Sequence, residues 1–163
     1  MNEDLLAIEE PENYFSGIGK NQLPTPTDIL LYLRISKDML QQEALQNRSH
    51  HRAVLALNFL TSGQIHVDNL TLPFSPGQAL LILPYQFHHF SQLSSPNLQW
   101  LFCTFELQPR TFLEPLRNRV INIGENTENI LQELLREWQR CHSLLEAEQL
   151  QTVLLRLLIA LKQ

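Results

Sequence analysis

The adjacent histidines His88 and His89 are the residues of this chain best suited to site chemistry. Imidazole hydrogen-bonds polar ligands near neutral pH and is the commonest metal ligand in proteins. Both residues lie in an expected strand, where successive side chains point to opposite faces, so only one of them can face an interior. Three interpretations are open for that imidazole: a hydrogen bond to backbone at a strand end, a polar contact to a small ligand, or a metal ligand.

The elements that must position this imidazole are strands, expected throughout residues 27–108. Some segments are continuously apolar, such as 53–60, whereas 64–68 alternates apolar and polar residues as a half-buried strand does. Asp68-Asn69 and Pro76-Gly77 are expected turns. Short strands separated by frequent turn signals indicate a sandwich or barrel. The expected strands cover 29–35, 53–60, 64–68, 70–74, 79–83, 87–93 and 98–107, with a helical turn or loop within 37–49.

The pattern changes to a helical period in residues 127–162. Apolar residues recur there at steps of three and four, which predicts two amphipathic helices. Asn126 or Thr127 is the expected cap of the first helix. A short break within 142–146 would make the helices antiparallel neighbours. The apolar positions are Ile130, Leu131, Leu134, Leu135, Trp138 and Cys141, then Leu150, Val153, Leu154, Leu157, Leu158 and Leu161.

Composition favours a single soluble domain. The chain has 163 residues, a formal net charge of −5 and no cluster of Lys and Arg. It is therefore a poor candidate for binding DNA directly. Cys103 and Cys141 are too few for a disulfide framework and are interpreted as reduced thiols in or near the core. With neither a signal-peptide pattern nor an apolar run long enough to cross a bilayer, a cytoplasmic location and no membrane partner are expected.

The stretch from Ser49 to Leu107 resembles the cupin superfamily, and more narrowly the sensor domain of AraC-type transcription regulators. The resemblance runs through PGQALLILPYQFHHF and LQWLFCTFELQPRTF into the C-terminal helices. On the second cupin motif, Gly77 takes the glycine position and His88 the histidine position. Leu83 stands in the usual proline slot and Tyr85 in the usual glycine slot, which departs from the pattern.

On the first cupin motif, the match is weaker where metal chemistry would lie. Gly63 is the closing glycine, and His50 and His51 lie where metal-binding histidines would be. Ala56 occupies the place of the acidic ligand. Because metal-dependent cupin enzymes typically use three histidines and a carboxylate, we expect no enzyme activity, no cofactor and no bound metal. If a metal binds, its ligands would be His50, His51 and His88.

The resemblance to sugar-responsive regulators also implies where a ligand would sit. It places ligand contacts at Ser62, Phe90, Trp100 and Phe102, to which we add His88 and Arg52 as polar candidates. Plain core packing is the alternative for Trp100 and Phe102, and solvent exposure the alternative for Arg52. The pocket looks less polar than that of a pentose sensor, so no particular sugar is predicted. The effector class expected is a sugar or a small organic acid.

These observations define a fold class, a mainly β chain with C-terminal helices. We expect a cupin-type double-stranded β-helix (a jelly-roll barrel), followed by two antiparallel α-helices. Residues 1–26 would form an N-terminal arm, 27–124 the barrel sensor domain, and 125–163 a helical pair for dimerisation. The arm carries Gly17, Gly19, Pro24 and Pro26 and at most a short helix. Its Asn13-Tyr14-Phe15 patch is a candidate lid for the pocket.

A homodimer is expected through the second C-terminal helix, whose apolar stripe is broad enough to serve a partner. The residues assigned to that interface are Leu150, Leu154, Leu157, Leu158 and Leu161. AraC-type regulators continue beyond this helix into a helix-turn-helix domain, so contact with DNA is expected only through a C-terminal domain that this chain lacks.

The function predicted is therefore small-molecule effector binding and dimerisation within an AraC-family regulator. One alternative is a stand-alone metal-dependent cupin enzyme, an isomerase or dioxygenase. Another is a catalytically idle cupin that only assembles with a partner protein.

Overall fold

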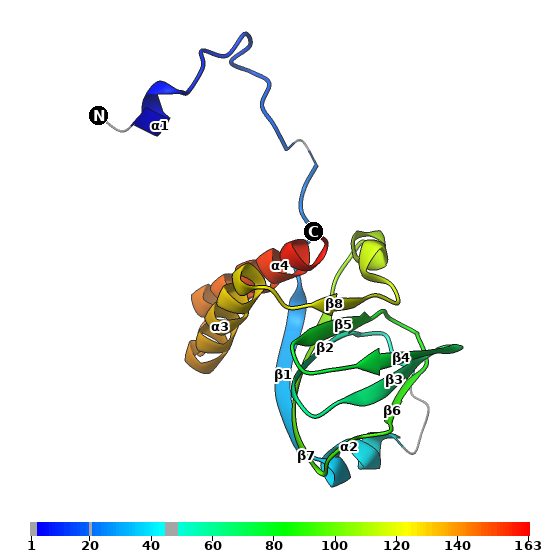
Figure 1. Cartoon of the computed structure of the whole chain (residues 1–163). Coiled ribbons are helices and arrows are strands. Elements are labelled where there is room, and N and C mark those ends of the chain that lie inside the picture. Colours follow the sequence, from blue (N-terminus) through cyan, green and yellow to red (C-terminus); the bar gives the residue numbers. More distant parts are fainter. Residues whose placement is uncertain (1–2, 20, 45–48) are drawn as a thin grey trace.

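The computed structural model describes residues 3–19, 21–44 and 49–163, which form two antiparallel sheets and a C-terminal helix pair (Figure 1). The large sheet has the order β1 (Thr27–Ser36), β7 (Asn97–Glu106), β2 (Ala53–Leu60), β5 (Gln78–Ile82), β8 (Val120–Asn122). The small sheet has the order β4 (Leu70–Phe74), β3 (Gly63–Val67), β6 (His88–Ser91). The helices are α1 (Glu3–Leu6), α2 (Lys37–Ala44), the 3-10 helix η1 (Arg110–Leu116), α3 (Glu125–Arg140) and α4 (Leu144–Leu161). The prediction of a mainly β chain with C-terminal helices is confirmed.

Some strands are continuously apolar and others alternate apolar and polar residues, because the first kind is buried on both faces and the second on one. In β2, Leu55 and Leu57 face the C-terminal helices, whereas Val54 and Ala56 face the small sheet, so the strand is apolar along most of its length. In β3 only alternate residues are buried, which matches the alternation of 64–68. The large sheet is thus a central layer between α3 and α4 on one side and the small sheet on the other (Figure 1).

The outer core, between the large sheet and the helices, contains the leucines that were assigned to a dimer interface. Leu150, Leu154, Leu157, Leu158 and Leu161 are all buried within the single chain, none more than 4% exposed. Their choice as interface residues is wrong, because the broad apolar stripe of α4 is covered by the outer face of the sheet.

Two elements and one cap were not foreseen from the sequence. The strand β8 and the 3-10 helix η1 follow the expected strand series, where no strong periodicity marks them. Helix α3 begins earlier than expected, with Gly124 as its N-cap and no side-chain capping bond, instead of Asn126 or Thr127. A short break separates α3 from α4, as predicted, but it covers 141–143 instead of 142–146. The second helix begins earlier because the Ser143 hydroxyl caps it by accepting a hydrogen bond from the Glu146 amide.

The turn between β2 and β3 shows why Gly63 is needed there. The positive φ of this turn falls on Thr61, at 79°, and not on the glycine. A Cβ at Gly63 would lie 2.8 Å from Leu93 Cδ2 and 3.1 Å from Trp100 ring atoms. The glycine therefore permits close packing of Trp100 against the turn, rather than the sharp bend itself.

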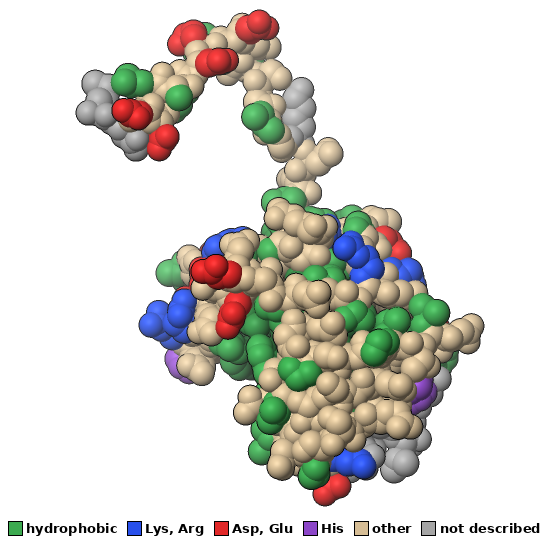
Figure 2. All heavy atoms as spheres, in the orientation of Figure 1, with side chains coloured by type: hydrophobic (Ala, Val, Ile, Leu, Met, Phe, Trp, Pro, Cys, Tyr) green, Lys and Arg blue, Asp and Glu red, His purple; other side chains and the backbone are tan. Residues whose placement is uncertain are grey.

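The arm before β1 extends away from the two sheets (Figure 1). Five of the 17 acidic residues lie in it, and Figure 2 shows them along its length. Its Tyr14 and Phe15 side chains are exposed and do not cover the sheets. Among the helices of the described segments, none is long and apolar enough to cross a bilayer.

The two cysteines occupy different environments, which gives a first testable prediction. Cys103 is fully buried in the outer core, and this burial raises the pKa of its thiol to about 12, whereas Cys141 is only partly buried. Because the thiolate is the reactive form, we expect an aromatic disulfide reagent at pH 8 to titrate one thiol in the folded protein. In guanidinium chloride it should titrate two. Rapid loss of both thiols under native conditions would contradict this assignment.

Candidate functional site

A continuous network of aromatic rings lies between the two sheets. Phe102 stacks on Tyr32 with centroids 5.3 Å apart and lies 5.5 Å from Phe90 of the small sheet. Phe90 in turn contacts Trp100 at 5.9 Å and His88 at 6.1 Å. The inter-sheet core therefore brings together four predicted ligand residues, His88, Phe90, Trp100 and Phe102.

The alternation along β6 decides which histidine faces inward. His88 is buried and points toward the inter-sheet core, whereas His89 lies on the outer face of the small sheet beside His66. The His88 Nδ1–H donates to the Gln86 carbonyl at 3.2 Å, and if the ring is neutral, Nε2 is then its acceptor nitrogen. His50 packs edge-to-face on His88 with centroids 5.3 Å apart.

The turn before β6 is held by a buried amide that sequence reasoning missed. Gln86 Oε1 accepts from the Leu83 amide at 2.8 Å, and its Nε2 donates to Asp68 and Asn118, each at 3.0 Å. Asp68 also accepts from the Phe87 amide. These bonds fix the backbone that carries His88. In the sequence, only the position of Gln86 two residues before His88 could have indicated this role. The burial of Gln86 depends on residues far away in the sequence, so it could not be predicted.

Two further residues reach the same core from the edge strand β1. Tyr32 and Arg34 pair in register with Phe102 and Trp100, so they share the inward face of the large sheet. The Arg34 guanidinium lies 4.5 Å from the centre of the Tyr32 ring, a cation–π contact. Both side chains are half-buried, which makes them more accessible than Phe102 or Trp100. In the sequence, only their spacing of two residues within an apolar strand indicated that Tyr32 and Arg34 share one face.

Trp100 behaves as a packing residue. Its ring is fully buried, its Nε1–H donates to the Thr61 carbonyl at 3.1 Å, and Phe74 and Phe90 pack against it at nearly 90°. Asn58 donates to the same Thr61 carbonyl at 2.9 Å. This end of the inter-sheet core is closed by a hydrogen-bonded cluster, so the end with His88 and His50 is the better candidate for a ligand.

The other two predicted ligand residues lie apart from this cluster. Ser62 is exposed in the turn after β2. Arg52 hydrogen-bonds Thr104 through Nε at 3.2 Å and forms an ion pair with Asp28. The Arg52 side chain thus links Asp28 of β1 to Thr104 of β7. A ligand would have to compete with Asp28 for the Arg52 guanidinium.

The three histidines considered for a metal do not come together. His50 and His88 face each other, but His51 is exposed and bonds Glu106 at 3.0 Å on the outside. Ala56 turns its methyl group into the inter-sheet core. In the part of the chain that the structure describes, no three His, Cys, Asp or Glu side chains gather as a metal site would need.

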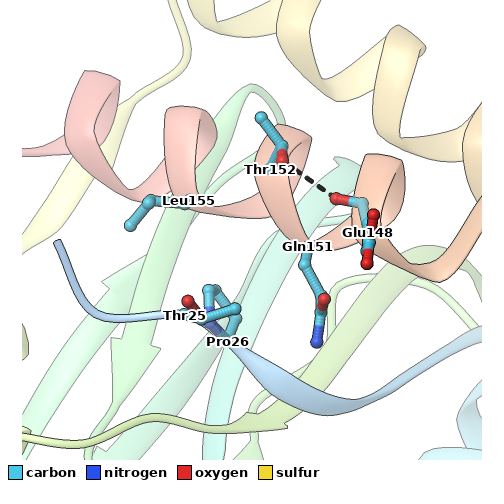
Figure 3. A pocket seen from close by; sticks show the side chains of 6 residues that line it. All are labelled: Thr25, Pro26, Glu148, Gln151, Thr152 and Leu155. Atoms are coloured by element: carbon cyan, nitrogen blue, oxygen red, sulfur yellow. Dashed lines mark hydrogen bonds between the residues drawn. The ribbon is translucent and has the colours of Figure 1, made fainter. Parts of the chain in front are cut away.

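A separate hollow of about 220 Å³ lies between the root of the arm and α4 (Figure 3). Thr25 and Pro26 form one side, and α4 the other, where the Thr152 hydroxyl donates to the Glu148 carbonyl at 2.9 Å. The hollow contains none of the predicted site residues. Its lining is Thr25, Pro26, Glu148, Gln151, Thr152 and Leu155.

No protein-family model matches the chain, and no curated protein matches it. One solved structure it is similar to is a cupin 2 domain-containing protein from Halorhodospira halophila, with 10% sequence identity and a TM-score of 0.34. That match covers 77% of this chain and 84% of the other.

Proposed function

We propose that this chain is a cupin-type sensor domain that binds a small effector between its two sheets, as part of an AraC-type transcription regulator. The supporting observation is a chain of ring contacts between the sheets, which runs from Tyr32 through Phe102 and Phe90 to His88 and His50. Small-molecule sites combine an apolar lining with a few fixed polar groups in this way.

The chemistry of the cluster favours an uncharged or weakly acidic ligand that carries hydroxyl groups. His88, held by the Gln86 carbonyl, offers an acceptor nitrogen for a ligand hydroxyl. Phe90 and Tyr32 offer faces for a sugar ring or an aromatic ring. Sugars and small organic acids both meet these requirements, so the effector class stays as broad as the sequence suggested.

A thermal-shift screen with sugars, sugar acids and aromatic acids tests the proposal. A ligand at 100 times its Kd stabilises the folded state by about 2.7 kcal/mol. In a chain of this length that would raise Tm by about 5–10 °C. We expect His88→Phe to abolish the shift, because the acceptor nitrogen is lost.

His89→Gln is the matched control, because it alters the neighbouring histidine on the opposite face of the same strand. It should leave the ligand-induced shift unchanged. Equal losses in both variants, or binding that survives His88→Phe, would refute the inter-sheet site. A transition metal retained by the purified protein and lost in His88→Phe would favour the enzyme alternative instead.

Dimerisation belongs to the same proposal, but through different residues from those first assigned. Leu144 and Leu145 at the start of α4 are 89% and 68% exposed and offer an apolar surface beside the helix pair. If the helices form the homodimer contact, Leu144→Ser together with Leu145→Ser should convert a dimer to a folded monomer with an unchanged circular dichroism spectrum. Light scattering after gel filtration measures the mass. A dimer that persists in this variant would place the contact elsewhere.

A further inference from the structure

Residues 3–19 of the arm combine negative charge with exposed apolar side chains. They contain five of the 17 acidic residues and none of the 12 Lys and Arg, so the rest of the chain is formally neutral. A segment of this kind fits a surface that offers cations beside aromatic rings. The large apolar side chains of the arm are all at least 60% exposed: Leu5, Leu6, Ile8, Tyr14, Phe15 and Ile18.

A surface with cations beside aromatic rings lies on η1 and at the end of α4. The Arg110 guanidinium lies 4.7 Å from the centre of the Tyr85 ring, which is 54% exposed. The Lys162 Nζ lies 3.0 Å from the centre of the Phe112 ring. Figure 2 shows Lys and Arg side chains over the position that η1 has in Figure 1. We call this the η1 surface, and its members are Arg110, Arg117, Arg119, Lys162, Tyr85 and Phe112.

The η1 surface keeps an excess of positive charge. Arg117 is bound to the Glu114 carboxylate by two hydrogen bonds, of 2.8 and 2.9 Å. Among the residues that the structure describes, no carboxylate forms an ion pair with the other three cations of this surface. Even with Asp68, which also acts on Arg117, four cations face two carboxylates. The surface is therefore suited to an acidic segment.

We propose that the arm docks on the η1 surface of its own chain, where Glu9, Glu10 and Glu12 meet the cations and the apolar side chains of the arm contact Tyr85 and Phe112. A single ion pair at a protein surface contributes little to stability. A tether, however, holds its two ends at an effective concentration of millimolar order, so that several weak contacts form together. The contact uses no residue of the proposed effector site, and the two proposals are independent.

The arm is long enough to reach the η1 surface. At its root, Thr25 and Pro26 line the same hollow as Leu155 of α4. Lys162 follows seven residues later at the end of this helix, about 10 Å further along its axis. An extended chain covers about 3.3 Å per residue, so the segment from Glu12 to Pro26 spans up to about 45 Å. The length of the tether therefore allows docking without a change in the domain.

Paramagnetic relaxation in NMR spectra of the full chain tests this inference. A nitroxide label at Ser16→Cys, in a Cys141→Ser background, reports the position of the arm, since the remaining Cys103 is buried. At about 0.01 M salt, where charges act over about 30 Å, we expect the label to abolish the amide signals of the η1 surface. The signals should return at about 1 M salt, where the screening length falls to about 3 Å.

Charge reversal on each side identifies the partners. In the labelled chain at low salt, Arg110→Glu with Arg119→Glu should preserve the η1 signals, because the arm no longer docks. Glu9→Lys, Glu10→Lys and Glu12→Lys together should have the same effect. When both sets of substitutions are combined, the charges are opposite again and the signals should be lost once more. A purely structural effect of the substitutions would not produce this rescue.

The control reverses two exposed cations elsewhere. Arg136→Glu with Arg140→Glu on α3 makes the same change in net charge and should leave the loss of η1 signals as in the parent. Intact η1 signals in the labelled parent at low salt would overturn the proposal, as would an unchanged loss in Arg110→Glu with Arg119→Glu. Loss of signals in an unlabelled chain mixed with the spin-labelled one would assign the arm to a second copy, which also contradicts docking within one chain.

Discussion

Replacing Leu154 by alanine is expected to lower the free energy of unfolding by about 2–5 kcal/mol. Leu154 is fully buried in the outer core, in the same cluster as Leu55 and Cys103 of the large sheet. Truncation removes the methyl groups that fill this layer and leaves a cavity, because neither the sheet nor the helix can close the gap completely. Urea denaturation measures the change as a lower midpoint at unchanged slope.

The control is Gln149→Ala on the same helix. Gln149 is exposed and lies outside the proposed dimer surface, so its replacement should change the free energy of unfolding by less than about 0.5 kcal/mol. Equal effects at the two positions would mean that α4 does not pack on the sheet as described. The comparison also tests the reassignment of the α4 leucines from a partner surface to the core of the single chain.

Replacing Trp100 by alanine is expected to lower the free energy of unfolding by about 3–5 kcal/mol. The substitution removes the ring that Phe74 and Phe90 pack against, and it leaves the Thr61 carbonyl with one donor instead of two. A residue that served mainly to stack on a ligand would behave differently, because its loss would weaken binding and leave stability nearly intact. Chemical denaturation followed by circular dichroism separates the two roles.

Trp138→Ala is the control of the same residue type. Trp138 is half-buried on α3, and the chain has two tryptophans, so each variant keeps one fluorescent reporter. We expect a smaller loss of stability in Trp138→Ala, and a blue-shifted emission from the buried Trp100 that remains. A larger loss at Trp138 would contradict the assignment of Trp100 to the inter-sheet core.

The candidate site could be predicted in part because strand residues alternate faces. That rule required one of His88 and His89 to face inward, and it put Phe90 on the same side as His88. It could not identify Arg34, Tyr32 or Gln86 as members of the site, because their positions depend on which strands become neighbours. Ser62 was assigned by resemblance and Arg52 as a polar candidate, and the structure places them in an exposed turn and in an ion pair with Asp28.

Local spacing was enough to establish the strand series, the two C-terminal helices, and the turns at Asp68 and Gly77. These features follow from periods of two and 3.6 residues and from turn preferences, which act over a few neighbouring residues. Sheet order, register and helix docking arise from contacts between distant segments. Only they decided that the α4 leucines face the sheet, that His50 meets His88, and that His66 lies opposite His89.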